Sequence, residues 1–443
     1  MTEERGTNGR SAGGSRRNEQ RTGGRRSRPR RVQVPPLLGG NGTAAGPAAE
    51  SRDGGEPRRF LFVVPPLTGH VNPTVAVGAE LARRGHKVAW TGHRAFLEPL
   101  LRRGSTIFAA EDEAFAARLR EARREWLGLR GPAALRFLWE EFIIPLGHAM
   151  LPGVEEAIRR FRPDVVVCDQ QALAGPVAAR RRGLPWATSA TTSAEFARPL
   201  AGMPLVEEWI RELIGGFQLD HGIEDLLDLR FSDHLVLAFT TSALVGDVSF
   251  FPEHFAFVGP ALRRTQAGDF PWRWLDEGGG RPAVLVSLGT LDGPAGERFF
   301  RVAAEAVRDM DVRAVFVAPP AVLPDPPPNV LVRERVPQLP LLKRMAAVVS
   351  HGGHNTVCET LAQGLPLVVA PIRADQPVVA RQVADAGAGV TVRYGRVGPD
   401  ELRSALGAVL EDASYREAAA RVAASFAAAG GAARAADRLE KLA

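Results

Sequence analysis

The chain has 443 residues, of which 45% are hydrophobic and 24% charged, a composition typical of a globular protein long enough for two or three domains. Its two cysteines, Cys168 and Cys358, are too few for a disulfide scaffold or a cysteine-rich zinc cluster. No apolar run approaches the roughly 18 residues of a membrane-spanning helix. No signal-peptide core is visible near the start, so we expect a cytoplasmic protein without stable membrane insertion.

Positive charge is concentrated at the N-terminus. The formal net charge is +6, yet residues 1–59 contain 13 Arg and 6 acidic residues, whereas the rest of the chain has 43 basic and 44 acidic residues. Because residues 1–57 are rich in Gly, Ser, Arg and Pro and lack apolar periodicity, we predict that they are disordered. Their arginines are compatible with a nucleic-acid or membrane tether. No aromatic residues interleave with them and the remaining chain is nearly neutral, so we expect no nucleic-acid partner.

Strand and helix patterns alternate from Phe60 onwards. A short apolar run ended by two prolines predicts a buried strand, an apolar stripe of helical period follows it, and a second apolar run predicts the next strand. This order is typical of a parallel βαβ unit, and it recurs later in the same half. The predicted strands are 60–64, 87–91, 165–168 and 185–189, with mostly helical stretches at 112–161 and 203–229.

A second α/β pattern follows a stretch rich in Pro and Gly. Apolar runs alternate with helical patterns, which predicts another doubly wound domain, with strands at 283–287, 312–318, 330–332, 346–350 and 366–370. In such proteins, ligands bind in the cleft at the carboxyl ends of the strands. The predicted organisation is a disordered tail (1–57), an N-terminal domain (58–260), a linker (261–282), a C-terminal domain (283–425) and a C-terminal helix (426–443).

The strongest motif lies at 350–361, where a strand ends, two glycines follow and a helix begins near His354. Free N–H groups and the positive end of the helix dipole make such a turn an anion site, and glycine lets a phosphate approach the backbone. The alternative is a glycine turn before an ordinary helix. The residues that can bind there are His351, Gly353, Asn355 and Thr356 for an anion and Glu359 for vicinal hydroxyls such as those of a ribose.

Two neighbouring strand ends add polar groups. Asp375 and Gln376 follow the strand at 366–370, and a carboxylate beside an amide offers acceptors and donors for sugar hydroxyls. The alternative for Asp375 is a helix N-cap. Ser287 and Thr290 follow the strand at 283–287 and add hydroxyl groups. Three strand ends therefore present anion, diol and polyol contacts, which suits a nucleotide sugar.

The first strand–helix turn, Gly69-His70-Val71-Asn72-Pro73, lacks the G-x-G-x-x-G pattern and is therefore no dinucleotide fingerprint. It places His70 at the start of a helix at the mouth of the cleft. Asp169 ends the strand at 165–168 and can face His70. A histidine with a carboxylate behind it is the usual arrangement of a general base. The alternative is a structural histidine.

These motifs together resemble a known family. The stretch 335–382 resembles the donor-binding motif of glycosyltransferase family 1, whose GT-B enzymes include the macrolide-type and other natural-product glycosyltransferases of bacteria. The turn Gly69–Pro73 is similar to their N-terminal catalytic motif, and the resemblance covers about 58–443. The residues that carry it are Val336-Pro337-Gln338, His351-Gly352-Gly353, Asn355-Thr356, Glu359 and Asp375-Gln376.

The resemblance implies an α/β fold of two Rossmann-like domains facing across a cleft. It also implies an inverting transfer, without metal or cofactor, from a UDP- or dTDP-sugar co-substrate to an acceptor. His70 would be the general base and Asp169 its partner. Where the family often has a Trp stacked on the base, this chain has Arg335, whose guanidinium can also stack. The implied donor-binding residues are Ser287, Thr290, Arg335, Val336, Gln338, His351, Gly353, Asn355, Thr356, Glu359, Asp375 and Gln376.

The acceptor is expected to be a hydroxyl of a hydrophobic small molecule, such as a natural product. A carotenoid or other lipid-like acceptor is the first alternative, and a nucleotide-sugar epimerase with the GT-B fold is the second. Asp309-Met310-Asp311 has the spacing of metal-dependent glycosyltransferases, but it precedes a strand, so we predict a solvated turn and no metal site. Aromatic residues that can line the acceptor site, or simply fill the core, are Trp126, Phe137, Trp139, Phe142, Phe196 and Trp209.

Overall fold

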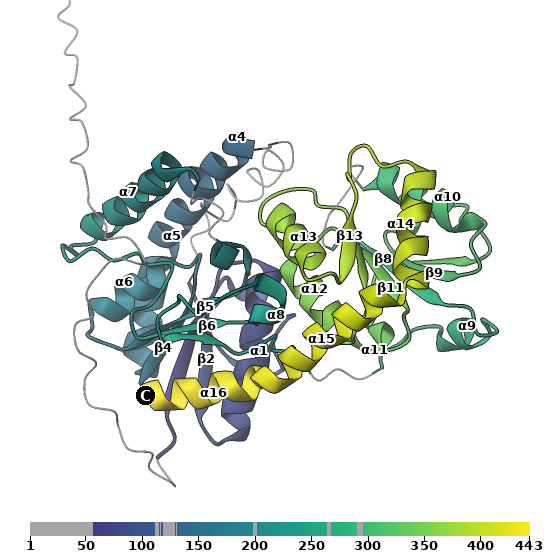
Figure 1. Cartoon of the computed structure of the whole chain (residues 1–443). Helices are drawn as coiled ribbons and strands as arrows, with labels where there is room; N and C mark the ends of the chain where they lie inside the picture. The colour runs from purple at the N-terminus through teal and green to yellow at the C-terminus, as the bar shows by residue number, and fades with distance from the viewer. Residues whose placement is uncertain are drawn as a thin grey trace, which may run out of the picture.

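The chain forms two α/β units that lie side by side in the computed structural model, each built on a parallel sheet (Figure 1). The structure describes residues 56–110, 115, 117, 129, 131–197, 202–263, 267–289 and 296–443. The tail up to residue 55, Trp126 and Thr290 lie outside the described residues, so the predictions made for them stay predictions.

The N-terminal sheet has seven parallel strands within the described residues, in the order β3-β2-β1-β4-β5-β6-β7. The order reverses between β1 and β4, and such a switch point opens a crevice at the carboxyl ends of the strands. β1 and β4 are almost wholly apolar because helices cover both faces of the sheet. The strands are β1 (Arg59–Val63), β2 (Lys87–Gly92), β3 (Thr106–Ala109), β4 (Val165–Asp169), β5 (Trp186–Ala190), β6 (Leu235–Ala238) and β7 (Phe255–Phe257).

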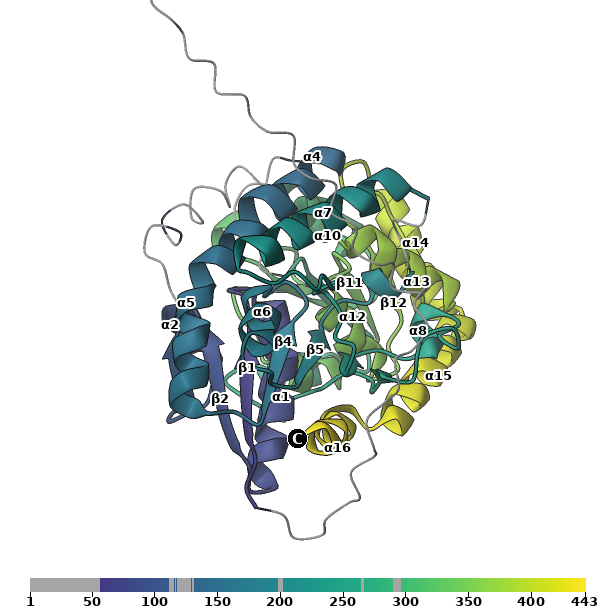
Figure 2. The same ribbon diagram turned by 90° about the vertical axis from the view of Figure 1, so that its left-hand side faces the viewer.

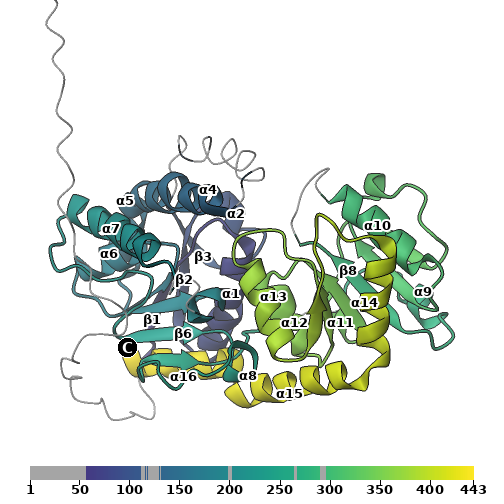
Figure 3. The ribbon, with the colours of Figure 1, turned by 45° about the horizontal axis from the view of Figure 1, so that its top comes forward.

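The helices of the N-terminal unit cover this sheet. α1 connects β1 to β2, while α4, α5 and α7 lie together at one side of the unit (Figures 1 and 3). None of the helices in the described segments combines the length and the apolar character that crossing a membrane requires. The helices are α1 (Thr68–Arg83), α2 (Arg94–Leu97), α4 (Gly131–Arg136), the π-helix η1 (Phe137–Ile143), α5 (Ile144–Phe161), α6 (Ala174–Arg180), the 3₁₀-helix η2 (Ala194–Ala197), α7 (Pro204–Asp220) and α8 (Ser242–Val245).

The C-terminal sheet has six parallel strands within the described residues, in the order β10-β9-β8-β11-β12-β13, with the switch point between β8 and β11. Its strands are β8 (Ala283–Ser287), β9 (Arg313–Val317), β10 (Val330–Arg333), β11 (Ala347–Ser350), β12 (Leu367–Val369) and β13 (Gly389–Thr391). Its helices are α9 (Trp272–Asp276), α10 (Glu297–Arg308), the 3₁₀-helix η3 (Pro320–Val322), α11 (Gln338–Leu342), α12 (His354–Leu361), α13 (Gln376–Asp385), α14 (Pro399–Glu411) and α15 (Ala413–Ala429).

The last helix, α16 (Gly431–Leu442), returns to the N-terminal unit. Gly430, with φ of 88°, ends α15 and lets the chain turn. α16 then packs beside α1, as Figures 1 and 2 show. The guanidinium of Arg84 donates hydrogen bonds of 2.7 Å to both Asp437 and Glu440 of α16. The C-terminal end of the chain therefore stabilises the N-terminal unit.

The second half of the predicted linker (261–282) packs against the C-terminal unit in the structure. Phe270 and Trp272 pack in the same hydrophobic cluster as Leu285 of β8, and the guanidinium of Arg313 lies 4.6 Å from the ring centroid of Trp274. Apolar side chains in this stretch therefore belong to the core of the C-terminal unit. Burying large aromatic side chains is favourable because it removes a large apolar area from water.

The aromatic residues considered for the acceptor wall lie mostly in the core. Trp139 and Phe142 of η1 belong to the cluster between β1, β4 and α5, and Phe196 belongs to an aromatic cluster beneath β6 and β7. Phe137 is also buried, and Trp209 is partly buried against the η1 cluster. Their burial agrees with the alternative that they are ordinary core residues.

Candidate active site

The N-terminal switch point brings His70 and Asp169 together. His70 lies in the first turn of α1, directly after β1, and Asp169 is the last residue of the neighbouring strand β4. The Nδ1 of His70 lies 2.9 Å and 3.0 Å from the two carboxylate oxygens of Asp169. The pair that the strand ends predicted is therefore present in the fold.

A third side chain completes this group. Thr191, which follows β5, donates a hydrogen bond of 2.9 Å to Asp169 Oδ2, and its hydroxyl lies 2.8 Å from His70 Nδ1. The backbone N–H of Gln171 donates to Asp169 Oδ1 at 2.9 Å. Asp169 is 1% exposed, so these donors replace water around the carboxylate. Sequence reasoning missed Thr191, although its position just after a central strand was a signal.

The environment of His70 prepares it to accept a proton at Nε2. Burial lowers the pKa of His70, but the Asp169 carboxylate outweighs burial and the pKa is raised above its ordinary value. Because Nδ1 faces the carboxylate, it carries the hydrogen, and the lone pair is on Nε2. Nε2 has no hydrogen-bond partner among the described residues, and the side chain of His70 is 16% exposed. The ring nitrogen that does not face Asp169 therefore has an unused lone pair.

The C-terminal switch point has a different character. After β11 the chain turns through Gly352, with φ of 86°, and α12 begins at His354. A Cβ on Gly353 would lie 2.6 Å from the ring of His351, and one on Gly289 would lie 2.7 Å from it. Only glycine therefore leaves room for the imidazole at these two positions. No side chain caps α12 in the described residues, so its first N–H groups are available to an anion.

His351 differs from His70 in its charge. Burial lowers the pKa of His351 to about 4, although Asp375 and a hydrogen bond with Ser287 oppose this shift. At neutral pH the ring is uncharged and can donate a single N–H. Its Nδ1 is buried without a partner in the described part of the chain. Beside the start of α12, this unused nitrogen can accept a hydrogen bond from a ligand, and it donates one to an anion when the ring takes the other tautomer.

A cavity of about 240 Å³ adjoins the N-terminus of α12. Gln338 donates a hydrogen bond of 2.5 Å to Glu359 on its wall. Burial raises the pKa of Glu359, against the opposing effects of this hydrogen bond and of Arg263. Sequence reasoning did not single out Arg263, which lies in the predicted linker. The cavity is lined by polar side chains and by residues predicted to bind the donor. These are Asn72, Arg263, Val336, Gln338, His354, Asn355 and Glu359.

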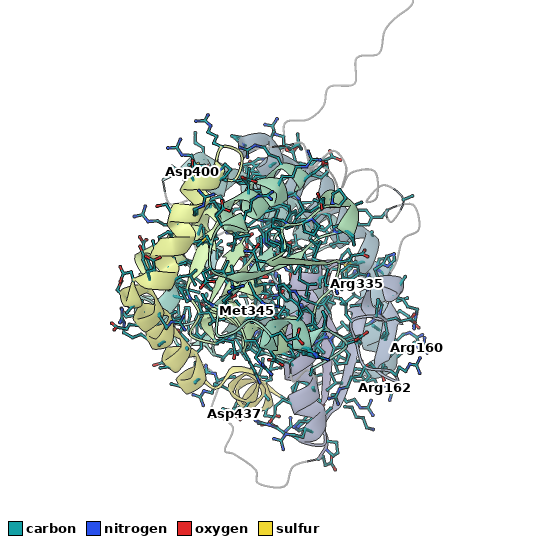
Figure 4. The ribbon with its side chains drawn as sticks, turned by 90° about the vertical axis from the view of Figure 1, so that its right-hand side faces the viewer. Arg160, Arg162, Arg335, Met345, Asp400 and Asp437 are labelled. Atoms are coloured by element: carbon teal, nitrogen blue, oxygen red, sulfur yellow. The ribbon has the colours of Figure 1, made fainter. Side chains whose placement is uncertain are left out.

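The other predicted donor-binding residues occupy different positions in the structure. Asn355 reaches across to the N-terminal unit and donates a hydrogen bond of 2.8 Å to the carbonyl oxygen of Gly69, next to His70. Ser287 is buried at the end of β8, and Thr356 lies in the first turn of α12. Arg335, labelled in Figure 4, is exposed. It is not among the residues that line the cavity.

Asp375 and Gln376 lie at the start of α13, after β12. The side-chain oxygen of Gln376 accepts hydrogen bonds from the backbone N–H groups of Ile372 and Arg373, at 2.9 Å and 3.1 Å, and so shapes its own loop. Asp375 accepts a hydrogen bond of 2.6 Å from Thr192 of the N-terminal unit. α12 and α13 form the side of the C-terminal unit that faces the N-terminal sheet (Figure 3).

Two facing parallel sheets, a His–Asp pair on one side and a glycine turn at a helix N-terminus on the other define a GT-B glycosyltransferase site. Residues 301–442 match the family described as "Erythromycin biosynthesis protein CIII-like, C-terminal domain". The chain is 30% identical over 426 residues to demethyllactenocin mycarosyltransferase of Streptomyces fradiae, covering 90% of each protein. It is 29% identical over 408 residues to 4'-demethylrebeccamycin synthase of Lentzea aerocolonigenes, covering 84% of this chain and 96% of that protein.

Solved structures agree with these relatives. The calicheamicin glycosyltransferase CalG4 has a TM-score of 0.72 to this chain at 27% identity, covering 87% of this chain and 98% of that one. The glycosyltransferase of kitacinnamycin has a TM-score of 0.71 at 26% identity, covering 88% of this chain and 100% of that one. The chain belongs to the bacterial natural-product glycosyltransferases of the GT-B fold, enzymes that act on nucleotide sugars.

Proposed function

We propose that this enzyme transfers a sugar, with inversion at the anomeric carbon, from a UDP- or dTDP-sugar to a hydroxyl of a hydrophobic small molecule. The observation that carries the proposal is the orientation of His70. Its Nδ1 is held by Asp169, which leaves the lone pair of Nε2 to take a proton. The donor-binding elements lie on the opposite side of this cleft.

The chemistry is a single displacement. Nε2 of His70 takes the proton of the acceptor hydroxyl while the acceptor oxygen bonds to the anomeric carbon. The bond between that carbon and the diphosphate oxygen breaks, and the nucleoside diphosphate leaves with the electron pair. Asp169 stabilises the imidazolium as it forms, since a buried carboxylate favours the charged ring. Attack from the face opposite the leaving group inverts the configuration.

The donor is held by the C-terminal unit in this proposal. The diphosphate lies at the N-terminus of α12, where N–H groups and the helix dipole stabilise the charge that develops on the leaving group. His351, Ser287 and Thr356 add donors there. Glu359 accepts from the ribose hydroxyls in the adjoining cavity, with Val336 and Gln338 close to the base. Asp375 and Gln376 bind the sugar.

The proposed reaction uses neither a metal nor a further cofactor. Asp309 and Asp311 lie between α10 and β9, at the amino end of that strand, where Asp311 forms an ion pair of 2.7 Å with Arg281. In the described ranges, no cluster of three side chains of the metal-ligating types occurs. The start of α12 can supply the electrophilic help that a metal gives in other glycosyltransferases.

The acceptor class rests on the relatives. Two of them are named for transfer to demethyllactenocin and for the synthesis of 4'-demethylrebeccamycin, which supports a natural product as the acceptor of this enzyme. A lipid-like acceptor and an epimerase remain the alternatives, and no feature of the described residues favours either one.

The test uses the full chain, a panel of UDP- and dTDP-sugars and several phenolic and alcohol acceptors. Thermal shifts rank the donors, because a tight ligand raises the melting temperature. NMR of the product should show an anomeric configuration opposite to that of the donor, with turnover unchanged in EDTA. Retention of configuration or loss of activity in EDTA would contradict the proposed mechanism, and donor consumption without acceptor would indicate an epimerase.

A further inference from the structure

Three consecutive hydroxyl side chains follow β5 and contact three different parts of the site. Thr191 binds Asp169 and His70, as described above. Thr192 donates a hydrogen bond of 2.6 Å to Asp375 Oδ2 at the start of α13. Ser193 donates a hydrogen bond of 2.5 Å to the side-chain oxygen of Gln382, in the middle of α13. One short segment of the N-terminal unit therefore connects the His–Asp pair to the donor-binding unit.

Ser193 and Gln382 form two hydrogen bonds with each other, one in each direction. The amide nitrogen of Gln382 donates back to the carbonyl oxygen of Ser193 at 3.1 Å. Ser193 is fully buried and Gln382 is 5% exposed. A buried polar group that loses its partner carries the full cost of its desolvation, so such a pair holds only in one relative position of the two elements. It sets the position of α13 against the end of β5.

Thr192 contacts the N-terminal end of α13 through Asp375. Asp375 directly precedes this helix, and Thr192 itself is 8% exposed. A hydrogen bond to one carboxylate oxygen restricts the rotation of the carboxylate and directs the other oxygen away from Thr192. Asp375 is only half-buried, and Thr192 occupies only its Oδ2, so Oδ1 is left for a ligand.

We propose that the segment Thr191–Ser193 is an interdomain positioning element that places the donor sugar against His70. Thr192 orients Asp375, Ser193 fixes α13, and Thr191 holds the His–Asp pair on the same stretch of backbone. Thr192 and Ser193 are positioning residues, since they act through Asp375 and Gln382. The inference rests on the proposed function, in which Asp375 binds the sugar of the donor.

The interface offers a matched control at another place. Ser425 of α15 donates a hydrogen bond of 2.8 Å to the hydroxyl of Thr241, next to α8. This contact also joins hydroxyl side chains of the two units, but it involves neither the His–Asp pair nor α13. Ser425→Ala therefore removes one interdomain hydrogen bond without removing any of those made by Thr191, Thr192 and Ser193.

The experiment compares Thr192→Val, Thr192→Ser and Ser425→Ala in the full chain, with folding checked by calorimetry. Affinities for a nucleotide sugar and for the matching nucleoside diphosphate are measured by titration. Thr192→Val should weaken binding of the nucleotide sugar by about 10-fold, the effect of losing a hydrogen bond to a charged group, and should leave the diphosphate affinity unchanged. Thr192→Ser and Ser425→Ala should bind both ligands as the parent does. An equal loss for both ligands would indicate a merely structural role and overturn the inference.

A double-variant cycle separates this inference from the proposed function. If Thr192 acts through Asp375, Thr192→Val combined with Asp375→Asn should be no worse than Asp375→Asn alone. Additive losses would overturn the inference. An impaired Asp375→Asn variant beside a parent-like Thr192→Val variant would contradict the inference only. A parent-like Asp375→Asn variant would contradict the sugar-binding role of Asp375 and the inference together.

Discussion

The two sheets have the same kind of strand order around their switch points, yet the histidines at these points differ in charge. His70 hydrogen-bonds directly to the Asp169 carboxylate, and its pKa is raised although burial opposes this. His351 lies between two glycines, and burial lowers its pKa to about 4. The comparison shows that the fold can adapt one residue type to proton transfer in one unit and to neutral hydrogen bonding in the other. The difference comes from the carboxylate that touches His70.

The largest expected effect comes from removing the base of the N-terminal unit. His70→Ala should lower kcat by about two to four orders of magnitude, the range for losing a general base, because an alcohol is a poor nucleophile until its proton leaves. Donor affinity should stay close to that of the parent, since the donor is held by the other unit. Steady-state kinetics and calorimetric titration measure the two quantities.

A strongly acidic acceptor provides the control for this variant. A nitrophenol ionises unaided, so it should recover part of the activity of His70→Ala, whereas an ordinary alcohol should not. Turnover of ordinary alcohols at the parent rate would show that His70 is not the base.

The next effect concerns the carboxylate that distinguishes the two histidines. Asp169→Asn should lower kcat less than His70→Ala does. Catalysis needs uncharged His70, so the parent should lose activity as pH falls through a pKa above the ordinary value of His. Without this carboxylate, only the charge of Asp375 opposes the effect of burial on the pKa of His70, and the acidic limb of the pH–rate profile should move to lower pH. An unmoved acidic limb would mean that Asp169 does not set the pKa of His70.

The same pair predicts how stability depends on pH. Because the pKa of His70 is raised in the folded state, its ion pair with Asp169 stabilises the fold fully below the pKa of the unfolded chain. This stabilisation is lost as pH rises through the folded-state pKa. The free energy of unfolding of the parent, relative to Asp169→Asn, should therefore decrease across this window. Denaturant titrations at several pH values measure it, and a constant difference would contradict the ion pair.

The C-terminal unit should respond in binding rather than in proton transfer. His351→Ala and Glu359→Ala should each weaken nucleotide-sugar binding by about 1–3 kcal/mol, the usual effect of leaving a buried hydrogen-bond partner unpaired. The acidic limb of the pH–rate profile should stay where it is in the parent. Calorimetric titration gives the affinities, with His221→Ala, at the C-terminal end of α7 and in contact with His148 of α5, as the matched control. Unchanged affinity in both variants would refute the donor assignment.

The smallest effect is expected at the N-terminus. Deleting residues 1–57 should leave folding and turnover unchanged, because the segment is separate in sequence from every motif of the site. Arg58, whose backbone N–H donates to His86 at 3.2 Å, stays in the shortened chain. A large decrease in activity or solubility would give the arginine-rich segment a role in the enzyme.

Much of the architecture was predictable because buried parallel strands are short, continuous apolar runs. Such runs identified β1, β4, β8 and β11, and these four strands form the two switch points. The edge strands β3, β7 and β13 escaped prediction because they are short and their residues are only partly buried. Their pairing depends on neighbouring strands rather than on their own pattern. The four-residue strand β6 was also missed, although it is buried inside the sheet.

The two strand-end histidines, the glycine turn and the acidic partners follow from the sequence alone, since a strand end followed by a helix start puts side chains at a known edge of the sheet. How these groups contact one another depends on tertiary packing. It placed Thr191, Thr192 and Ser193 against three different partners from distant parts of the chain, and it left Arg335 exposed. Burial and the distance to a carboxylate set the charge of each histidine, and both arise only when separate segments pack together.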